Sequence, residues 1–480
     1  MSIWRKKPID AYNADASKSE LNRVLSRWGL TSLGIGAIIG GGIFTLTGIA
    51  AHDHAGPALA LSFVIAGIGC LFASLCYAEF ASVLPVEGSA YAYAYGTIGE
   101  LFAWFIGWNL ILEYMMGATT VAVAWSGYFN KLLHLFGIHI PDWLTNDPVT
   151  QKGPAFNLLA FLITWVVTAI LVKGIKEAAK TNNVIVILKV AVVLFVIFAG
   201  AFYVDTANWS PFIPEQVPVL DAAGAPTGEF TFGFGGVLTA ATIVFFAYIG
   251  FDAVSTQAGE AINPRKDVPF AIIASLVVCT LLYIAVSLVL TGMVPYGQLD
   301  IKAPVASAFE GVGMKWAVYL ITIAATAGLM SVMLVMMLGQ TRIFLGMAKD
   351  GLIPYNMFGK LHEKFKTPYR STILIGFVIS VVAALTPINS VSEMCSMGTL
   401  LAFAMVSVAV LILRIKQPNL ERPYRTPFIY FVAPAGALFN IFLMTYVREH
   451  TWYAFLIWGA VGVAVYFLYS RRHSHLHPKK

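Results

Sequence analysis

The sequence predicts an all-α membrane protein with about twelve transmembrane helices. Of its 480 residues, 58% are hydrophobic and only 12% are charged, whereas roughly a quarter are charged in soluble domains. The apolar residues gather in runs of about twenty, which is the length that a helix needs to cross a bilayer. The lysines and arginines between these runs gather on one side. No soluble core buries this much apolar surface, so lipid is expected to cover it.

Twelve runs are long enough to span the membrane. They lack the alternation of a membrane β-barrel, and a helix satisfies every backbone polar group within its own segment. The eighth run is too long for one ordinary span and is expected to project beyond the bilayer. The expected spans are residues 30–50, 57–83, 98–124, 154–172, 183–204, 234–257, 269–293, 314–346, 369–386, 390–413, 427–446 and 452–470.

The basic residues set the expected orientation. With the N-terminus inside the cell, most of the 31 lysines and arginines lie in inside loops and tails. Both termini are therefore expected in the cytoplasm, with the chain in the cell membrane. This asymmetry also accounts for the net charge of +6, so no nucleic-acid partner is expected. The basic residues that fall outside are Lys131, Lys152, Lys302, Lys315 and Arg448.

The longest outside loop is expected to join two structural repeats, because it separates five spans from seven and holds no Lys or Arg. All four cysteines fall inside apolar runs, so no disulfide-linked partner subunit is expected. The predicted parts are the tail 1–29, repeat one 30–204, the loop 205–233, repeat two 234–413, two further helices within 414–470 and the tail 471–480.

The first span contains three consecutive glycines, Gly40, Gly41 and Gly42, near its middle. Each glycine costs a helix about 1 kcal/mol relative to alanine, so the run predicts a break. A break frees N–H groups at the start of the outer half-helix, which suit a carboxylate, and carbonyl groups at the end of the inner half, which suit an ammonium. The alternative is close packing of small residues against a neighbouring helix.

The sixth span is interrupted in a similar way at Gly250, which is followed by the lone acid Asp252. Paired interruptions in corresponding spans are typical of a transporter site at the interface of two repeats. Phe246, just before this interruption, is a candidate gate over bound substrate. The alternative is that its ring simply faces lipid or the protein core.

Lys189 lies in the fifth span with apolar neighbours on every side. An ionisable residue inside a membrane indicates function, and burial makes its charged form costly, so its protonation can be coupled to conformation. The alternative is that Lys189 snorkels to the cytoplasmic face, roughly 9 Å away. Glu113, in the third span, could relay protons, partner Lys189, face a cationic substrate or bond a neighbouring helix. Gly117 and Met336 are candidates for lining the pocket.

Five segments of the chain carry distinctive motifs. They are GAIIGGGIF (36–44), YAEFASVLPVEGSAYAYAY (77–95), GEAINPRKDVPFAI (259–272), GQTRIFLGMAKDGLIP (339–354) and ERPYRTP (421–427). The first three resemble the signature segments of the amino acid–polyamine–organocation superfamily, and the last two are similar to its cationic-amino-acid-transporter-type branch. This resemblance implies the LeuT-type fold, in which spans one to five and six to ten form inverted repeats and two helices follow.

The resemblance also implies roles for individual residues. The amides of Gly41 and Gly42 would hold the carboxylate of the substrate. Lys189 would occupy the place of the sodium ion in sodium-driven relatives, so that its protonation replaces the cation. The carbonyl groups that would receive the substrate ammonium belong to Ile38, Phe246, Ala247 and Ile249.

Together these inferences predict an amino acid permease that works by alternating access. Proton symport is expected, with no sodium and no cofactor; an exchanger of the same fold is the alternative, and a non-transporting sensor is disfavoured by the short tails. No nucleophile–base pair or metal cluster lies at membrane depth, so an enzyme is not expected. The branch name suggests cationic substrates, but if Glu113 serves Lys189 the pocket is apolar, and neutral or broad specificity is expected.

Overall fold

The structure is a computed structural model of the whole chain, and it describes most of the 480 residues. The predicted N-terminal tail, residues 1–29, lies largely outside the described part. The described residues are 5–7, 25–84, 89–151, 153–173, 178–220, 226–256, 258, 261–365 and 367–476.

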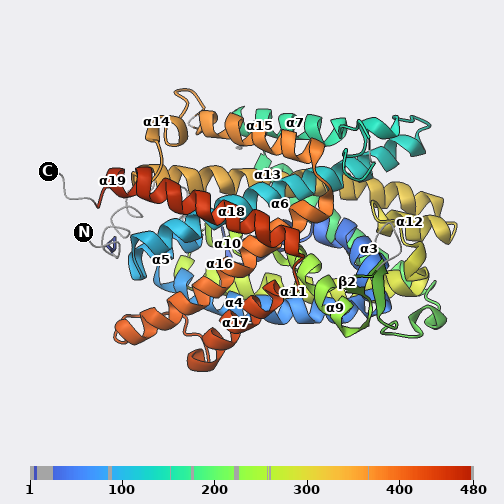
Figure 1. Cartoon of the computed structure of the whole chain (residues 1–480), viewed down its shortest axis with the longest axis horizontal. Helices are drawn as coiled ribbons and strands as arrows, with labels where there is room; N and C mark the ends of the chain where they lie inside the picture. Colours follow the sequence, from blue (N-terminus) through green and yellow to red (C-terminus); the bar gives the residue numbers. More distant parts are fainter. Residues whose placement is uncertain are drawn as a thin grey trace.

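Long helices run along the longest axis of the molecule and pack into one bundle (Figure 1). Among the described residues, eight stretches are long and apolar enough to cross a membrane, and three shorter apolar helices lie beside them. The first stretch, Arg27–Val83, reverses direction at Gly56, where φ is +57°, and so holds two crossings. The described chain therefore contains the twelve crossings that the sequence predicts.

The crossings follow the predicted runs closely. The eighth is a helix of 35 residues, as its long apolar run predicts, and the third also runs on well beyond its predicted end. In chain order the crossings are α2 (Arg27–Ile38) with η1 (Gly42–Leu46), α3 (Thr47–Ala50) and η2 (Ala51–Ala55); α4 (Leu59–Val83); α6 (Glu100–Leu135); α7 (Leu158–Lys173); α8 (Ala178–Ala201); α9 (Gly233–Val244) with η6 (Phe245–Tyr248) and α10 (Ala253–Thr256); α11 (Pro264–Met293); α13 (Lys315–Lys349); α15 (Tyr369–Leu385); α16 (Ile388–Lys416); α17 (Ile429–Met444); and α18 (Glu449–Val465).

Several short elements connect the crossings, and the apolar pattern did not predict them. The loop 205–233 contains an antiparallel hairpin, in which Val217 pairs with Thr231. The connecting elements are η3 (Gly56–Ala58), α5 (Ser89–Thr97), η4 (Asp142–Leu144), η5 (Thr206–Trp209), β1 (Val217–Leu220), β2 (Pro226–Thr231), η8 (Tyr296–Gln298), α12 (Pro304–Gly311) and α14 (Tyr355–Phe358). After α18, η9 (Tyr466–Ser470) and α19 (Arg471–His473) continue the last crossing.

The packing of the crossings has an internal symmetry. Each of the first four packs against the crossing five places later: the break of the first against η6, α4 against α11, α6 against α13, and α7 against α15. The fifth and tenth crossings occupy matching places, since α8 packs on α13 and α16 packs on α6. An offset of five crossings reverses the direction of the helix, so this pairing fits the predicted inverted repeats, and the division of the chain into repeats stays a prediction.

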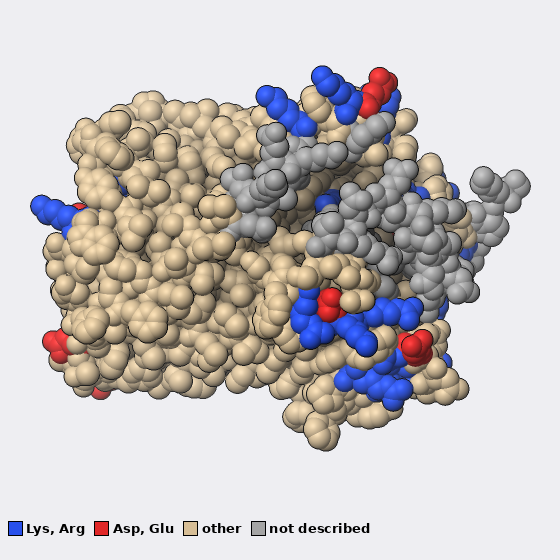
Figure 2. All heavy atoms as spheres, turned by 180° about the vertical axis from the view of Figure 1, so that it is seen from behind, with Lys and Arg blue, Asp and Glu red and all other residues tan. Residues whose placement is uncertain are grey.

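Both described ends of the chain lie at one end of the bundle, which we call the basic end (Figure 1). They meet there, because Arg5 donates to the carbonyl of Leu476 (3.0 Å) and Lys7 pairs with Asp350 at the end of α13 (3.1 Å). Figure 2 shows most of the visible lysines and arginines gathered over the same end. The charge asymmetry seen in the sequence is therefore also present in the folded chain.

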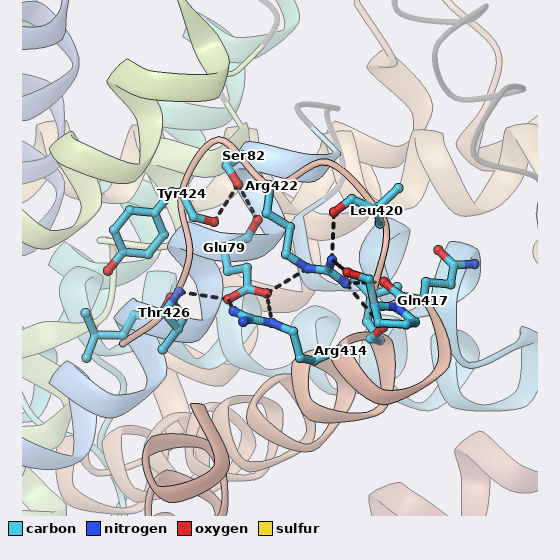
Figure 3. A network of polar contacts seen from close by, with 11 residues as sticks. Glu79, Ser82, Arg414, Gln417, Leu420, Arg422, Tyr424 and Thr426 are labelled. Atoms are coloured by element: carbon cyan, nitrogen blue, oxygen red, sulfur yellow. Dashed lines mark hydrogen bonds and ion pairs between the residues drawn. The ribbon is translucent and has the colours of Figure 1, made fainter. Parts of the chain in front are cut away.

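A buried carboxylate near the basic end ties two signature segments together (Figure 3). Glu79 of α4, fully buried, receives two hydrogen bonds from Arg414 at the end of α16, at 3.0 and 2.5 Å. Arg422, in the loop that follows, pairs with the same carboxylate at 3.1 Å, and the backbone N–H of Thr426 donates to it at 2.9 Å. The YAEF and ERPYRTP motifs thus meet, and Glu79 holds the loop before α17 against α4.

We expect Glu79→Gln to lower the stability of the protein sharply. The substitution leaves two arginines beside a neutral amide, and breaking a buried ion pair costs about 3–5 kcal/mol. The measurement is the apparent unfolding temperature in detergent. Glu421→Gln is the matched control, because Glu421 is 83% exposed in its 3.7 Å pair with Arg265 and such pairs contribute about 0–1 kcal/mol. Equal shifts in the two variants would contradict the expectation.

Candidate functional site

The first crossing is broken at the glycine run, as predicted. Helix α2 ends at Ile38, Ile39 is extended with ψ of 103°, and the outer half begins at Gly42. The last carbonyl groups and the first N–H groups of a helix have no partner within it. The break therefore leaves carbonyl groups at the end of α2 and N–H groups at the start of the outer half without partners in their own helix.

The sixth crossing is broken at Gly250. Helix η6 ends at Tyr248, Ile249 is extended with ψ of 130°, Gly250 has φ of +123°, and the helix resumes at Ala253. A Cβ atom on Gly250 would lie 2.9 Å from the carbonyl carbon of Ala37 in the first crossing. Glycine is required here both for its backbone conformation and for this close approach.

The two breaks lie against each other. A Cβ atom on Gly42 would lie 2.3 Å from the Cα of Ala247, so the backbones are in direct contact. The carbonyl oxygens of Ile38 and Ala247 both lie within hydrogen-bond distance of one hydroxyl, that of Tyr283 on α11, at 2.8 and 2.9 Å. Two of the four carbonyl groups that the resemblance assigned to the ammonium are therefore neighbours. Of the other two, the Phe246 oxygen already accepts the N–H of Ile249.

The predicted pocket residues gather around the ring of Phe246. Cβ atoms placed on Gly41 and Gly117 would lie 3.7 and 4.0 Å from that ring. The Gly117 position also lies 3.5 Å from the sulfur of Met336 and 3.4 Å from that of Cys395. Gly117, Phe246 and Met336 thus form a corner that is apolar apart from the Cys395 thiol. Gly40, by contrast, faces Val332 at 3.0 Å, as close packing would require.

Lys189 is fully buried and reaches the end of the inner half-helix. Its Nζ donates to the carbonyls of Gly36 (2.6 Å) and Ile39 (3.1 Å), and it does not snorkel toward the basic end. Gly328 of α13 makes room for its stem, because a Cβ atom there would lie 2.6 Å from the Lys189 Cδ. The ammonium therefore neutralises the negative end of a half-helix. Its role in proton coupling stays a prediction.

Glu113 and Asp252 lie apart from Lys189. Neither carboxylate oxygen of Glu113 has a hydrogen-bond partner among the described residues, so the pair with Lys189 that the sequence left open is not formed here. Asp252, also buried, accepts hydrogen bonds from the hydroxyl of Tyr114 (3.0 Å) and the N–H of Gly250 (3.3 Å). Asp252 thereby stabilises the break in the sixth crossing.

The described residues contain no group of three or more His, Cys, Asp or Glu that could hold a metal ion. The four cysteines are buried and free. The absence of a sodium requirement stays a prediction.

Sequence reasoning did not find Tyr283, Gly328 or Cys395. Each lies in an ordinary apolar run, and each contacts the site only because distant crossings pack together. No signal in the sequence distinguishes Tyr283 from the other buried tyrosines of the spans.

Comparison with known proteins adds a family and named relatives. The family model described as "Amino acid permease" matches residues 25–466. The methylthioribose transporter and the branched-chain amino acid permease BcaP, both of Bacillus subtilis (strain 168), are 45% and 46% identical to the chain, and each match covers 99% of both proteins. The vacuolar cationic amino acid transporter 2 of Arabidopsis thaliana is 38% identical over 88% of this chain and 64% of its own length.

Proposed function

The chain belongs to the amino acid permease family, and from this membership we propose that it is a proton-coupled symporter for neutral amino acids with small or branched side chains. The family makes it a membrane transporter and not an enzyme, and confirms both the resemblance to the superfamily and the predicted fold class. In this proposal both termini face the cytoplasm, because the basic end of a membrane protein is the inner one.

The substrate backbone binds between the two breaks. Its carboxylate meets the N–H groups of Gly41 and Gly42, and its ammonium meets the carbonyls around Ile38 and Ala247. The contact between the two broken crossings is the observation that carries the proposal, because it brings the carbonyl groups of Ile38 and Ala247 close to the glycine run.

The substrate side chain lies in the corner formed by Gly117, Phe246 and Met336. This corner favours an apolar side chain, and Cys395 adds a polarisable thiol rather than a charge. The name of one relative, a branched-chain amino acid permease, supports the same class, whereas the plant relatives are named for cationic amino acids. A cationic side chain would need a buried carboxylate facing it.

The proposal is tested first by binding and then by transport. In a thermal-shift screen of the purified protein against the twenty amino acids, valine, leucine, isoleucine and alanine should raise the unfolding temperature most. Strong shifts from arginine and lysine alone would contradict the substrate class. In proteoliposomes, an imposed pH gradient should drive uptake without sodium, and a requirement for sodium would contradict proton coupling.

We expect Gly117→Ala to narrow the substrate range. The added methyl group lies in van der Waals contact with Met336 and Cys395, so the helix tolerates it while the corner loses volume. Binding of leucine should weaken about tenfold or more relative to alanine, the usual effect of one methylene in an apolar pocket. Gly346→Ala is the control, because a Cβ atom there meets nothing within 4 Å. It should leave the ratio of leucine affinity to alanine affinity unchanged.

A further inference from the structure

Tyr283 joins the two broken crossings through a single hydroxyl. Its side chain comes from α11 and is fully buried. The hydroxyl oxygen lies 2.8 Å from the carbonyl oxygen of Ile38 and 2.9 Å from that of Ala247. A phenol carries one proton, so the two carbonyls share one donor.

Both carbonyls lack their helical partners because of the breaks. In an unbroken helix the oxygen of Ile38 would accept from the N–H of Gly42, and that of Ala247 from the N–H of Phe251. A buried carbonyl group without a donor is costly, and these two lie where water is scarce. In the empty site, the Tyr283 hydroxyl is the donor that the structure supplies to them.

We propose that the hydroxyl of Tyr283 replaces the substrate ammonium when the site is empty, and so allows the empty carrier to change between its inward- and outward-facing states. This inference rests on the proposed function, and it adds to it the residue that permits net transport instead of exchange. When substrate binds, its ammonium supplies new donors to the two carbonyls, and the phenol oxygen can itself accept one of them.

The consequence concerns one step of the transport cycle. A symporter must return empty after it releases its substrate, whereas an exchanger always crosses loaded. Between its inward- and outward-facing states the empty carrier passes through a closed state in which the two carbonyls are buried. If they have no donor there, the free energy of that closed state rises and the return slows. The loaded carrier is unaffected, because the ammonium is present.

The test compares Tyr283→Phe with Tyr248→Phe in proteoliposomes. Tyr248 is an equally buried neighbour whose hydroxyl donates to the carbonyl of Phe63, which is not at a break (2.7 Å). Both substitutions keep the aromatic packing among these residues, whose rings lie 5.3–6.3 Å apart. Radiolabelled leucine is the probe, and two rates are measured: net uptake into empty vesicles, and exchange into vesicles preloaded with leucine.

For Tyr283→Phe, we expect net uptake to fall about tenfold or more while exchange stays within about twofold of wild type. Tyr248→Phe should change both rates by the same factor. Equal loss of net uptake and exchange in Tyr283→Phe, or unchanged net uptake, would overturn the inference. Net uptake by wild type is measured first, and its absence would contradict the proposed function. The ratio of net uptake to exchange in Tyr283→Phe is then compared with wild type, and an unchanged ratio would contradict this inference alone.

A measurement on the wild type covers the case in which Tyr283→Phe does not fold. If the hydroxyl serves the empty carrier well, internal leucine should accelerate uptake by less than about twofold, since return of the empty carrier does not limit the rate. Acceleration of about tenfold or more would mean that the empty carrier is held back in spite of Tyr283, and would overturn the inference.

Discussion

Lys189→Ala is expected to bind leucine normally and to lose the accumulation that a pH gradient drives. In wild type, one proton per substrate and a gradient of one pH unit drive accumulation of up to about tenfold. The variant should only equilibrate leucine across the membrane. The measurement is the steady-state ratio of internal to external leucine in proteoliposomes with and without the gradient.

The reason lies in the contacts of the Lys189 ammonium. It donates to the carbonyls of Gly36 and Ile39, the last turn of the inner half-helix, and no part of it reaches solvent. Loss of its proton removes both the charge that faces the half-helix and a hydrogen-bond donor, so protonation and the position of α2 are linked. Alanine offers nothing to protonate, so the gradient has no group through which to act.

Lys173→Ala is the matched control for this experiment. Lys173 ends α7 and is exposed, so its loss removes a lysine without touching the site. It should retain accumulation within about twofold of wild type. If Lys189→Ala also retained gradient-driven accumulation, the proton-coupling role of Lys189 would be wrong, and the buried carboxylates Glu113 and Asp252 would become the candidates.

The crossings were predictable from the sequence because the bilayer fixes their length and excludes any other backbone structure. The short elements were not. Helices α5 and α12 and the hairpin of β1 and β2 lie outside the long apolar runs, where hydrophobicity carries no such constraint. The long extension of α6 past residue 124 was missed because Lys131 and His134 lower its hydrophobicity.

The breaks were also predictable, since a glycine run is a local signal with a local cost. The side chains that serve the breaks were not. Tyr283 meets Ile38 across 245 positions of the sequence, and Tyr114 meets Asp252 across 138. Such contacts depend on how crossings of the two repeats pack, which single-residue patterns do not encode. For the same reason the sequence indicated Glu79 and Arg422 only as parts of separate motifs.

Gly42→Ala is expected to abolish transport and binding, whereas Gly41→Ala is expected to reduce them only a few-fold. A methyl group on Gly42 would lie 2.3 Å from the Cα and 2.9 Å from the N of Ala247, and backbone atoms cannot move aside as a side chain can. The two broken crossings would have to separate, which pulls the carbonyl of Ala247 away from that of Ile38. Leucine should then give no thermal shift, and uptake should fall to about 1% of wild type or less.

Gly41→Ala separates this steric effect from the general cost of losing a glycine. The methyl group there meets Ala124 at 3.5 Å, and Leu329 and the ring of Phe246 at 3.7 Å, which are ordinary van der Waals distances, and the backbone N–H is retained. Uptake should stay within a few-fold of wild type, since no backbone atom has to move to make room for this methyl group. If Gly41→Ala were as inactive as Gly42→Ala, flexibility of the whole glycine run would be the requirement. Transport would then not depend on the contact between the two breaks, because the Gly41 methyl group leaves that contact intact.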